Sequence, residues 1–333
     1  MSKFDKILVI GGAGYVGSAL VPKLLAYGYG VKVLDLFIYG REVFAPFRCP
    51  RLSEVAGDIR DEKFLRKEIP GSDAIIHLAC ISNDPSYELD SVFGKSVNYD
   101  SFIPLVGIAK KSGVSRFIYA SSSSVYGIKE MSTTEDMPLD PLTDYSKYKA
   151  MCEEVLLSEA NDDFIVTVVR PATVSGYSPR LRLDLTVNLL TNHAISSRSI
   201  TVFGGDQKRG NLHIEDMTDL YLLLLEQPGH KIHKKIYNVG NENLSVREIA
   251  EIIAKLLGDD ISIVTTPTND TRSYHICSER IKRDLGFEAN RTIGKAVLDL
   301  KEAFEAGRVT DSMNDIKYYN IKTMKRFLQK EKI

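Results

Sequence analysis

KILVIGGAGYVG, residues 6–17, is the stretch that decides the fold. An aliphatic run leads into three glycines spaced G-x-x-G-x-x-G, Gly11, Gly14 and Gly17, and a helical pattern follows directly. Glycine permits a tight turn and a close backbone approach to a ligand, while a helix N-terminus offers unpaired N–H groups and the positive end of a dipole. The spacing therefore predicts a strand-to-helix turn that binds the diphosphate of a dinucleotide.

The end of the second strand indicates which dinucleotide binds. Tyr15 and Val16 complete the glycine loop, and the next aliphatic run ends in Asp35. A carboxylate at this position accepts hydrogen bonds from both ribose hydroxyls of adenosine and repels a 2′-phosphate. The following residues, Leu36 and Phe37, offer no arginine to neutralise such a phosphate. We therefore expect NAD rather than NADP.

Strand-like runs alternate with longer helical patterns through the first half of the chain. After the first unit come VKVLDLF, AIIHLAC, RFIYASS and IVTVVRPA, each short and rich in aliphatic or β-branched residues. Such alternation predicts right-handed crossovers and a parallel sheet with helices on both faces. The expected fold is α/β, a Rossmann-type doubly wound parallel sheet.

The regular alternation ends after residue 177. A loop-rich stretch, SPRLRLDLTVN, precedes a mixture of helical patterns and short strands. We expect an NAD-binding Rossmann domain over residues 1–177, to which residues 201–240 contribute returning elements. Residues 178–200 and 241–333 are expected to form a smaller, partly interleaved C-terminal substrate-binding lobe.

Composition excludes several classes of partner. The chain has 333 residues, 44% of them hydrophobic, and its 43 basic and 44 acidic residues give a net charge of -1, so we expect no binding to nucleic acid or to an anionic membrane. The N-terminal apolar run is too short for a signal peptide or a membrane span, which favours a cytoplasmic protein. The cysteines show no CxxC pair or metal-ligand spacing and are expected to be reduced thiols, with no metal site: Cys49, Cys80, Cys152 and Cys277.

A second motif suggests chemistry. DYSKYKAMCEE, residues 144–154, places Tyr145 and Lys149 one helical turn apart and therefore on one face of a helix. A nearby cation stabilises a phenolate and lowers the phenol pKa from about 10. Such a phenol can take a proton from an alcohol while a hydride leaves the carbon. Upstream, the run RFIYA ends in serines 121–124, which places hydroxyls at the carboxyl edge of the sheet, where open α/β folds bind ligands.

In combination these motifs resemble the extended short-chain dehydrogenase/reductase superfamily, in its nucleotide-sugar epimerase/dehydratase branch. The resemblance implies that Tyr145 is the catalytic base, that Lys149 binds the nicotinamide ribose and lowers the tyrosine pKa, and that Ser122 shares the proton of the substrate hydroxyl. It covers nearly the whole chain, through GGAGYVG, GDIRD, HLACIS, SSSSVYG, YSKYK, RPATVSGYSPR, QKRGNLHIED and YNVGNENLSVREIAE.

The same resemblance implies further contacts to the cofactor. Asp58 and Ile59, in GDIRD, are similar to the residues that hold adenine. Ala79 and Cys80 would line the cofactor cleft, with Cys80 as a packed apolar contact. Asn98 resembles a buried asparagine that stabilises a helix in the family.

A nucleotide-sugar substrate brings its own diphosphate, which arginine binds well because its planar fork can bond two oxygens at once. By resemblance, Arg209 and Arg272 match diphosphate-binding positions and Asn188 matches a substrate contact. Arg180 and Arg182, in the loop SPRLRLD, are either further contacts near the sugar or solvated loop charges.

The reaction class follows from the strand end after RFIYA. The family's 4,6-dehydratases need a carboxylate and a second acid there, whereas this chain has Ser123 and Ser124, which would face the substrate. We therefore expect alcohol–ketone chemistry at C4 of a nucleotide-diphosphate hexose or heptose. The 4-keto sugar is either released, as by a 4-dehydrogenase, or re-reduced, as by a 4-epimerase. A 4-ketoreductase, a non-catalytic NAD sensor and a reductase of non-sugar ketones remain alternatives.

Two helical segments carry apolar stripes that predict self-association. They are residues 96–113 and 145–159. Members of the family that the chain resembles commonly dimerise by packing these two helices into a four-helix bundle. We therefore expect a homodimer.

Overall fold

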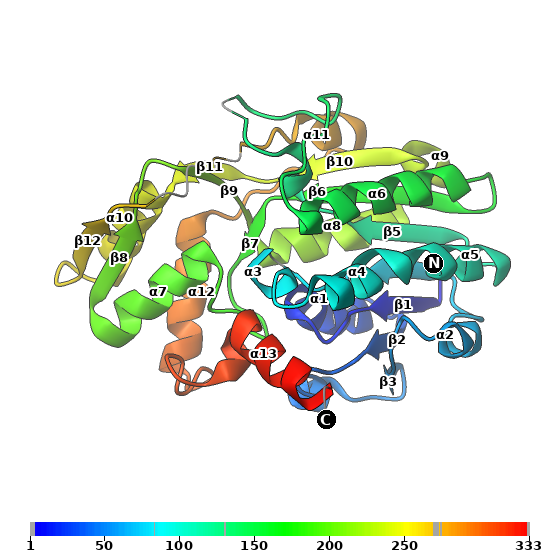
Figure 1. The fold of residues 1–333 in the computed structure, drawn as a ribbon, viewed down its shortest axis with the longest axis horizontal. Coiled ribbons are helices and arrows are strands. Elements are labelled where there is room, and N and C mark those ends of the chain that lie inside the picture. Colours follow the sequence, from blue (N-terminus) through cyan, green and yellow to red (C-terminus); the bar gives the residue numbers. More distant parts are fainter. Residues whose placement is uncertain (1–3, 83, 130, 269–272, 274, 332–333) are drawn as a thin grey trace.

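A parallel sheet forms the centre of the protein in a computed structural model that describes residues 4–82, 84–129, 131–268, 273 and 275–331 (Figure 1). Its strands lie in the order β10-β6-β5-β4-β1-β2-β3, and every neighbouring pair is parallel. This order confirms the expected Rossmann-type α/β fold. The strands are β1 (Lys6–Ile10), β2 (Gly30–Asp35), β3 (Leu52–Ala56), β4 (Ala74–His77), β5 (Arg116–Ala120), β6 (Ile165–Pro171) and β10 (Lys235–Val239).

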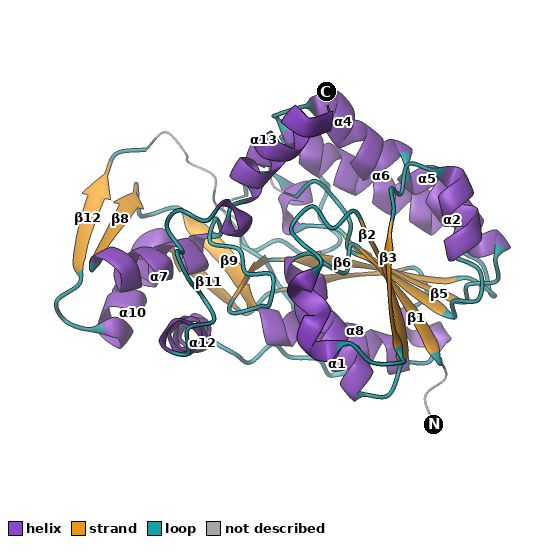
Figure 2. Ribbon diagram, turned by 90° about the horizontal axis from the view of Figure 1, so that it is seen from below, coloured by secondary structure: helices purple, strands orange, loops and turns teal. Residues whose placement is uncertain are grey.

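Helices cover both faces of this sheet, as its sequence pattern requires. Successive residues of β1 point to opposite faces, so Val9 packs in one hydrophobic cluster and Leu8 in another. Figure 2 shows α1 (Tyr15–Ala26) and α8 (Ile214–Glu226) on one side of the sheet. The other side carries α2 (Glu62–Glu68), α3 (Asp84–Tyr87), α4 (Ser91–Lys95), η2 (Ser96–Asp100), α5 (Phe102–Lys111) and α6 (Asp144–Glu159). Shorter elements connect these layers: η1 (Glu42–Phe47), η3 (Ser123–Tyr126), α9 (Gly229–Ile232) and α11 (Glu279–Leu285).

A smaller lobe has its own hydrophobic cluster. Val187, Ile200, Ile253 and Val297 belong to this cluster. The lobe contains α7 (Thr186–Ser197), β8 (Ser199–Phe203), α10 (Val246–Leu257), β12 (Ser262–Thr266) and α12 (Ile293–Glu305). A three-stranded sheet of β7 (Thr173–Ser175), β9 (Lys208–His213) and β11 (Glu242–Ser245) joins it to the rest of the chain.

The division between domain and lobe differs in two places from the sequence prediction. Strand β8 pairs with β12 in the lobe, so the elements of 201–240 that return to the main sheet are α8 and β10. The last helix, α13 (Asn320–Glu331), follows η4 (Ile316–Tyr318) and packs against the Rossmann half. The rings of Phe93, in α4, and Phe327 lie 5.9 Å apart, and Met324 is buried in the hydrophobic cluster on that face of the Rossmann half. Packing against this core, and not proximity in sequence, decides where α13 lies.

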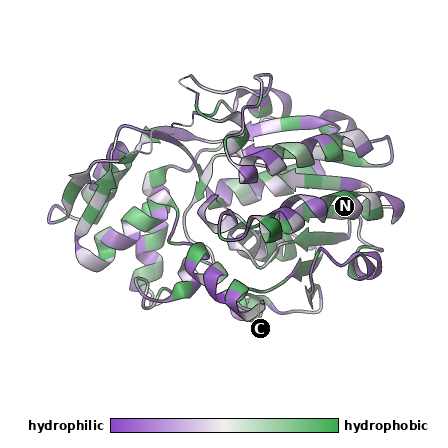
Figure 3. Cartoon of the chain, viewed as in Figure 1, coloured by the Kyte–Doolittle hydropathy of each residue, from purple (hydrophilic) through white to green (hydrophobic). Residues whose placement is uncertain are grey.

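Surface and interior are separated in the usual way, since the helices carry hydrophilic and hydrophobic residues on different faces (Figure 3). No helix among the described residues combines the length and the apolar character that crossing a bilayer requires. All four cysteines are free thiols in the structure. Within the described part of the chain, His, Cys, Asp and Glu side chains do not gather in groups of three or more that could hold a metal ion.

Candidate active site

A cavity of about 440 Å³ lies at the carboxyl ends of the central strands, within the size range of small-molecule sites. It meets the ends of β1, β2, β4, β5 and β6, the position at which open α/β sheets bind ligands. Most of the residues singled out in the sequence share this one cavity. Those that line it are Gly11, Gly14, Tyr15, Val16, Gly17, Asp35, Ile59, Ala79, Cys80, Ser122, Ser123, Ser124, Tyr145, Lys149, Arg180, Arg182 and Arg209.

The glycine loop leaves no room for side chains. Gly11 has a φ of +80°, and a Cβ there would lie 2.4 Å from the backbone nitrogen of Ala79. A Cβ on Gly17 would lie 2.4 Å from the carbonyl oxygen of Gly12. Gly14 begins α1 without a side-chain cap, so the first N–H groups of the helix remain available to an anion. This turn fits the diphosphate of a dinucleotide.

Asp35 ties the glycine loop to the loop after β2. One carboxylate oxygen accepts a hydrogen bond from Ala13 N at 2.9 Å and the other accepts one from Phe37 N at 2.7 Å. Burial raises the pKa of Asp35, and the two backbone donors oppose that rise. Each carboxylate oxygen can accept a second hydrogen bond, and Asp35 lines the cavity, so the geometry is compatible with the ribose contact expected from the sequence.

The remaining cofactor candidates separate into lining and supporting residues. Ile59 lines the cavity, whereas the carboxylate of Asp58 pairs with Arg60, accepting from Nε at 3.0 and 2.9 Å, and does not line it. Asn98 is buried and bonds both backbone groups of Ile81, accepting from N at 2.7 Å and donating to O at 3.1 Å. It therefore joins the segment after β4 to the helix that follows, as the resemblance implies.

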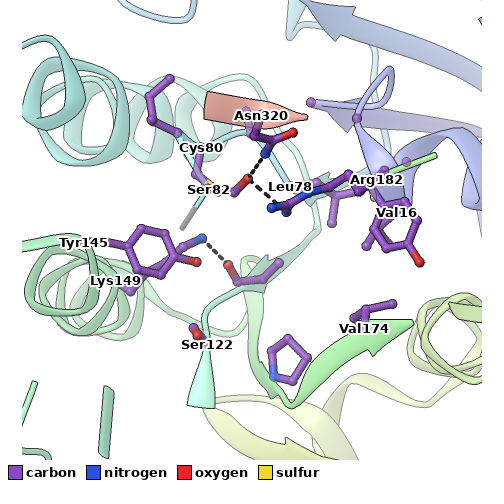
Figure 4. A pocket seen from close by; sticks show the side chains of 18 of the residues that line it. Val16, Leu78, Cys80, Ser82, Ser122, Tyr145, Lys149, Val174, Arg182 and Asn320 are labelled. Carbon is purple, nitrogen blue, oxygen red and sulfur yellow. Dashed lines mark hydrogen bonds between the residues drawn. The ribbon is translucent and has the colours of Figure 1, made fainter. Parts of the chain in front are cut away.

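Tyr145 and Lys149 enter the cavity from the first turns of α6 (Figure 4). The helix begins in a capping box, in which Thr143 Oγ1 accepts from Ser146 N and Ser146 Oγ accepts from Thr143 N at 3.1 Å. Lys149 Nζ donates to the carbonyl oxygen of Ala120 at 2.6 Å and lies 5.9 Å from the centroid of the Tyr145 ring. The lysine is only 3% exposed, so the end of β5 fixes the position of its charge.

The pKa of Tyr145 departs from the sequence expectation. Burial raises it, the nearby Cys80 and Asp84 raise it further, and a hydrogen bond with Ser122 lowers it. Burial of the phenol is the largest of these effects, so the pKa of Tyr145 is raised in the protein alone, in contrast to the lowering expected from Lys149.

The serines stand opposite this phenol, at the end of β5. Ser122 Oγ accepts from Ser124 N at 3.1 Å and from Ser124 Oγ at 2.9 Å, which caps η3 and fixes the turn. Ser123 and Ser124 also line the cavity. This strand end therefore presents hydroxyl groups to a ligand, and no carboxylate.

A buried polar network supports the serine turn from behind. Ser121 Oγ donates to Glu153, and the Glu153 carboxylate is paired with Arg170, whose Nη1 donates to Tyr126 OH at 2.7 Å. Tyr126 OH in turn donates to Asn238 Oδ1 at 2.7 Å. Sequence reasoning missed Glu153, although it follows Lys149 by four residues and so shares a helix face with it.

The residues predicted to bind the substrate do not all line the cavity. Arg209 lines the cavity from β9, whereas Arg272 lies outside the described residues. The prediction for Asn188 is wrong: it is 0% exposed and does not line the cavity. Its Oδ1 accepts from Gly176 N at 3.0 Å and its Nδ2 donates to Tyr15 OH at 3.1 Å. Asn188 lies on the buried face of α7, so its amide bonds the loop that precedes the helix.

Arg180 and Arg182 are not solvated loop charges. They are 6% and 7% exposed, and burial lowers the pKa of Arg180 to about 10. The Arg180 guanidinium stacks on the ring of Tyr39, 3.6 Å from its centroid, and Nη2 donates to Asn320 Oδ1. Tyr39 and Asn320 line the cavity as well, and no short motif in the sequence marks either of them.

Known proteins share this arrangement of sequence and fold. A family model described as "NAD dependent epimerase/dehydratase family" matches residues 7–240. UDP-glucose 4-epimerase of Lactobacillus helveticus is 30% identical, over 79% of this chain and 84% of that protein. UDP-glucose 4-epimerase of Bacillus subtilis is 27% identical, over 88% of this chain and 95% of that protein.

A solved structure gives the same picture. DesIV, a dTDP-glucose 4,6-dehydratase from Streptomyces venezuelae solved with NAD bound, superposes with a TM-score of 0.80 at 28% sequence identity. The match covers 90% of this chain and 98% of that one. Epimerases and dehydratases therefore both share the fold of this chain.

Proposed function

The chain belongs to the NAD-dependent epimerase/dehydratase family, and from that premise we propose that it oxidises the C4 hydroxyl of a nucleotide-diphosphate hexose or heptose. The product is a 4-keto sugar, which is released or re-reduced on its other face. The observation that carries this proposal is the meeting of Tyr145, Lys149 and Ser122 with the glycine loop in one cavity.

The residues for the cofactor are the glycine loop, Asp35, Ile59, Ala79 and Cys80, which follow the strand ends in turn. Bound NAD supplies a hydride acceptor, and its oxidised ring adds the positive charge that a buried phenol needs in order to ionise. Lys149, held by Ala120, adds to that field and would hold the nicotinamide ribose.

The protein's own groups carry the proton. Ser122 bonds the C4 hydroxyl and orients it toward Tyr145, and the Tyr145 phenolate accepts the hydroxyl proton as the C4–H bond breaks. Reversal of these steps returns a proton to the C4 oxygen of a keto sugar. The same two side chains therefore serve oxidation and reduction.

The cavity favours this chemistry over elimination. Among the described residues that line it, only Asp35 and Asp84 carry carboxylates. Asp35 bonds the backbone of two loops at the cofactor end of the cavity. Asp84 lies in α3, and its carboxylate accepts a hydrogen bond from Thr143 Oγ1 at 2.6 Å. The end of β5 offers Ser123 and Ser124 in place of an acid and a base, and the 4-epimerases among the relatives support epimerisation or oxidation at C4.

The test is incubation of the purified protein with NAD and separate UDP-, dTDP- and GDP-linked hexoses and heptoses. Proton NMR of the sugar reports inversion at C4, and the absorbance of NADH reports release of a keto sugar. Inversion without NADH accumulation identifies a 4-epimerase, and stoichiometric NADH identifies a 4-dehydrogenase. Consumption of NADH with a 4-keto sugar alone would favour the reductase alternative, and absence of hydride exchange with every sugar nucleotide would favour the NAD sensor.

We also propose a cytosolic homodimer. Free cysteines are typical of a reducing compartment. Helices α4, α5 and α6 lie side by side on one surface of the protein (Figure 1), and they expose Val92, Ile103 and Met151, which are 79%, 46% and 38% accessible. A second copy packed on α5 and α6 would cover this apolar surface.

A further inference from the structure

Arg182 carries a buried hydrogen-bond donor that no described residue satisfies. Its Nε donates to Asp184 Oδ1 at 2.9 Å and its Nη1 donates to Ser82 Oγ at 3.2 Å. Its Nη2 is buried without a hydrogen-bond partner among the described residues, although the guanidinium lines the cavity. A buried charged donor left unpaired is costly, so this geometry indicates a place for an acceptor supplied by a ligand.

The Arg182 side chain extends along the cavity wall from the glycine loop to Ser82. Figure 4 shows its stem beside Val16 and Leu78 and its guanidinium at Ser82. The contacts agree: Asn188 Nδ2 donates both to the carbonyl oxygen of Arg182, at 2.9 Å, and to Tyr15 OH, at 3.1 Å. The loop that carries Arg182 is therefore fastened to the first turn of α1, where the N–H groups of the glycine loop begin.

A second buried cation stands next to the first. Arg180 Nε also has no hydrogen-bond partner among the described residues, and the charge of Arg182 lowers the pKa of Arg180. Two like charges in a desolvated site repel each other, and Asp184, which pairs with Arg182, is one carboxylate beside two guanidinium groups. Arginine forks match the paired oxygens of a diphosphate.

Helix α13 holds both partners of the Arg182 guanidinium. Asn320 Nδ2 donates to Ser82 Oγ at 2.9 Å, and Asn320 N donates to Asp184 Oδ2 at 2.8 Å. The Asp184 carboxylate thereby caps the N-terminus of α13, where the helix dipole favours a negative charge. Asn320 thus connects the last helix to the segment after β4 and to the loop after β7.

We propose that Arg182 binds the diphosphate of the dinucleotide together with the glycine loop, and that Asn320 of α13 holds Arg182 in this position and slows release of the cofactor. The inference rests on the cofactor half of the proposed function and is independent of the sugar. The diphosphate of a nucleotide-sugar substrate has the same chemistry. We assign Arg182 to the cofactor because its stem lies beside Val16 and Leu78 and its backbone carbonyl shares a donor with Tyr15 OH, whereas Arg209 lies on β9, where we place the substrate.

Arg182→Met tests the assignment, because it keeps the apolar stem and removes the charge and the fork. Titration calorimetry should show that the Kd for NAD rises by about tenfold or more, equivalent to about 1.4 kcal/mol, while the Kd for UDP, dTDP or GDP stays within about threefold. Arg66→Met is the matched control, since Arg66 is an exposed residue of α2 outside the cavity, and it should change neither affinity.

The opposite pattern, weaker nucleoside diphosphate binding with unchanged NAD binding, would overturn the assignment in favour of the substrate. Unchanged affinities for both ligands, or equal loss of both, would overturn it as well. Circular dichroism of the free variant checks its folding. If Arg182→Met does not fold, Arg182→Lys keeps the charge without the fork and should still weaken NAD selectively, and equal NAD affinity in that variant would overturn the proposal.

Asn320→Ala tests the lock separately. Stopped-flow displacement of bound NADH should show faster release than in the wild-type protein, with the Kd for nucleoside diphosphates unchanged. An unaltered release rate would overturn the role of α13. Neither measurement needs a sugar substrate, so a failure here is distinguishable from a failure to find sugar turnover.

Discussion

Glu153 and Arg170 form an ion pair in which both side chains are 3% exposed, directly behind the serine turn of the candidate active site. Ser121 donates to the carboxylate and Arg170 donates onward to Tyr126, so the pair links α6, β6 and the end of β5. The helix that carries Tyr145 and the strand end that carries Ser122 are therefore held by one buried network.

Glu153→Ala should lower the free energy of unfolding by about 3–5 kcal/mol, because removing one partner leaves the Arg170 guanidinium buried without its counter-charge. Urea unfolding followed by circular dichroism measures the change. The neighbouring Glu154 is exposed, so Glu154→Ala should change the unfolding free energy by less than about 0.5 kcal/mol. Equal stabilities of the two variants would contradict the structural role of the pair.

Tyr145→Phe should lower kcat on the natural sugar nucleotide by about 10²–10⁴-fold, since the variant keeps the ring and loses the proton acceptor. Binding of NAD should remain close to that of the wild-type protein. Tyr148 lies on the same helix but outside the cavity, so Tyr148→Phe is the control that should keep its activity. Substantial turnover by the Tyr145 variant would remove the phenol from the mechanism.

Sugar oxidation should accelerate as the pH rises. The Tyr145 phenol must lose its proton in order to act as a base, and burial raises its pKa, so the active form gains population toward alkaline pH. Lys149→Met removes a stabilising cation, raises that pKa further and should shift the rise of kcat/KM to higher pH. A pH–rate profile that is identical in the wild-type protein and the Lys149 variant would contradict the electrostatic role of the lysine.

His77 should make the fold sensitive to acid. It is 3% exposed, its Nδ1 has no hydrogen-bond partner among the described residues, and burial lowers its pKa to about 3. Below pH 6.5, the ordinary pKa of about 6.5 means that histidine is protonated in the unfolded chain, whereas His77 stays neutral in the folded protein. The free energy of unfolding therefore decreases by about 1.4 kcal/mol per pH unit as the pH falls toward 3.

His77→Phe keeps an aromatic ring next to Tyr119 and Phe102 and should reduce this loss by about 2 kcal/mol between pH 6.5 and 5. Urea unfolding at the two pH values measures it. His230 is exposed, and His230→Gln should retain the full pH dependence of the wild-type protein. An unchanged pH dependence in the His77 variant would show that protonation of His77 does not cause the loss of stability at acidic pH.

Charges on α5 and α6 should break the proposed dimer. Ile103→Glu combined with Met151→Glu places carboxylates in the exposed apolar surface and should give a monomer in sedimentation equilibrium. Leu298→Glu, on α12 of the lobe, adds a charge at a comparably exposed apolar position and should leave the oligomeric state unchanged. A wild-type protein that sediments as a monomer at micromolar concentration contradicts the dimer directly.

Much of the site could be predicted from the sequence because its geometry is local. Three features each lie within one element or one connection: the glycine spacing, the end of β2 and the helical turn from Tyr145 to Lys149. Their residue spacing alone therefore determines which groups lie close together. Glu153 carries the same kind of signal, since it continues the face that Tyr145 and Lys149 define.

The residues that the sequence did not reveal come together over long distances. Asn320 and Ser82 are bonded across 238 positions, and neither lies in a pattern that points to the other. Asn188 was misassigned for a related reason: an amide suits a ligand or a buried turn equally well, and only the register of α7 decides between them. The pKa of Tyr145 depends mainly on burial by segments that are distant in the sequence, so it could not be predicted from the spacing of residues in a motif.

The position of α13 has a consequence for how the protein is made. During synthesis on the ribosome the glycine loop and every strand of the main sheet, up to β10, emerge before Asn320. The main sheet can therefore form, and leave the glycine loop open to a dinucleotide, before the final helix is translated. If Asn320 holds the cofactor contact as proposed, exchange of the nucleotide after docking requires the helix to detach locally, and the cofactor then behaves as part of the fold.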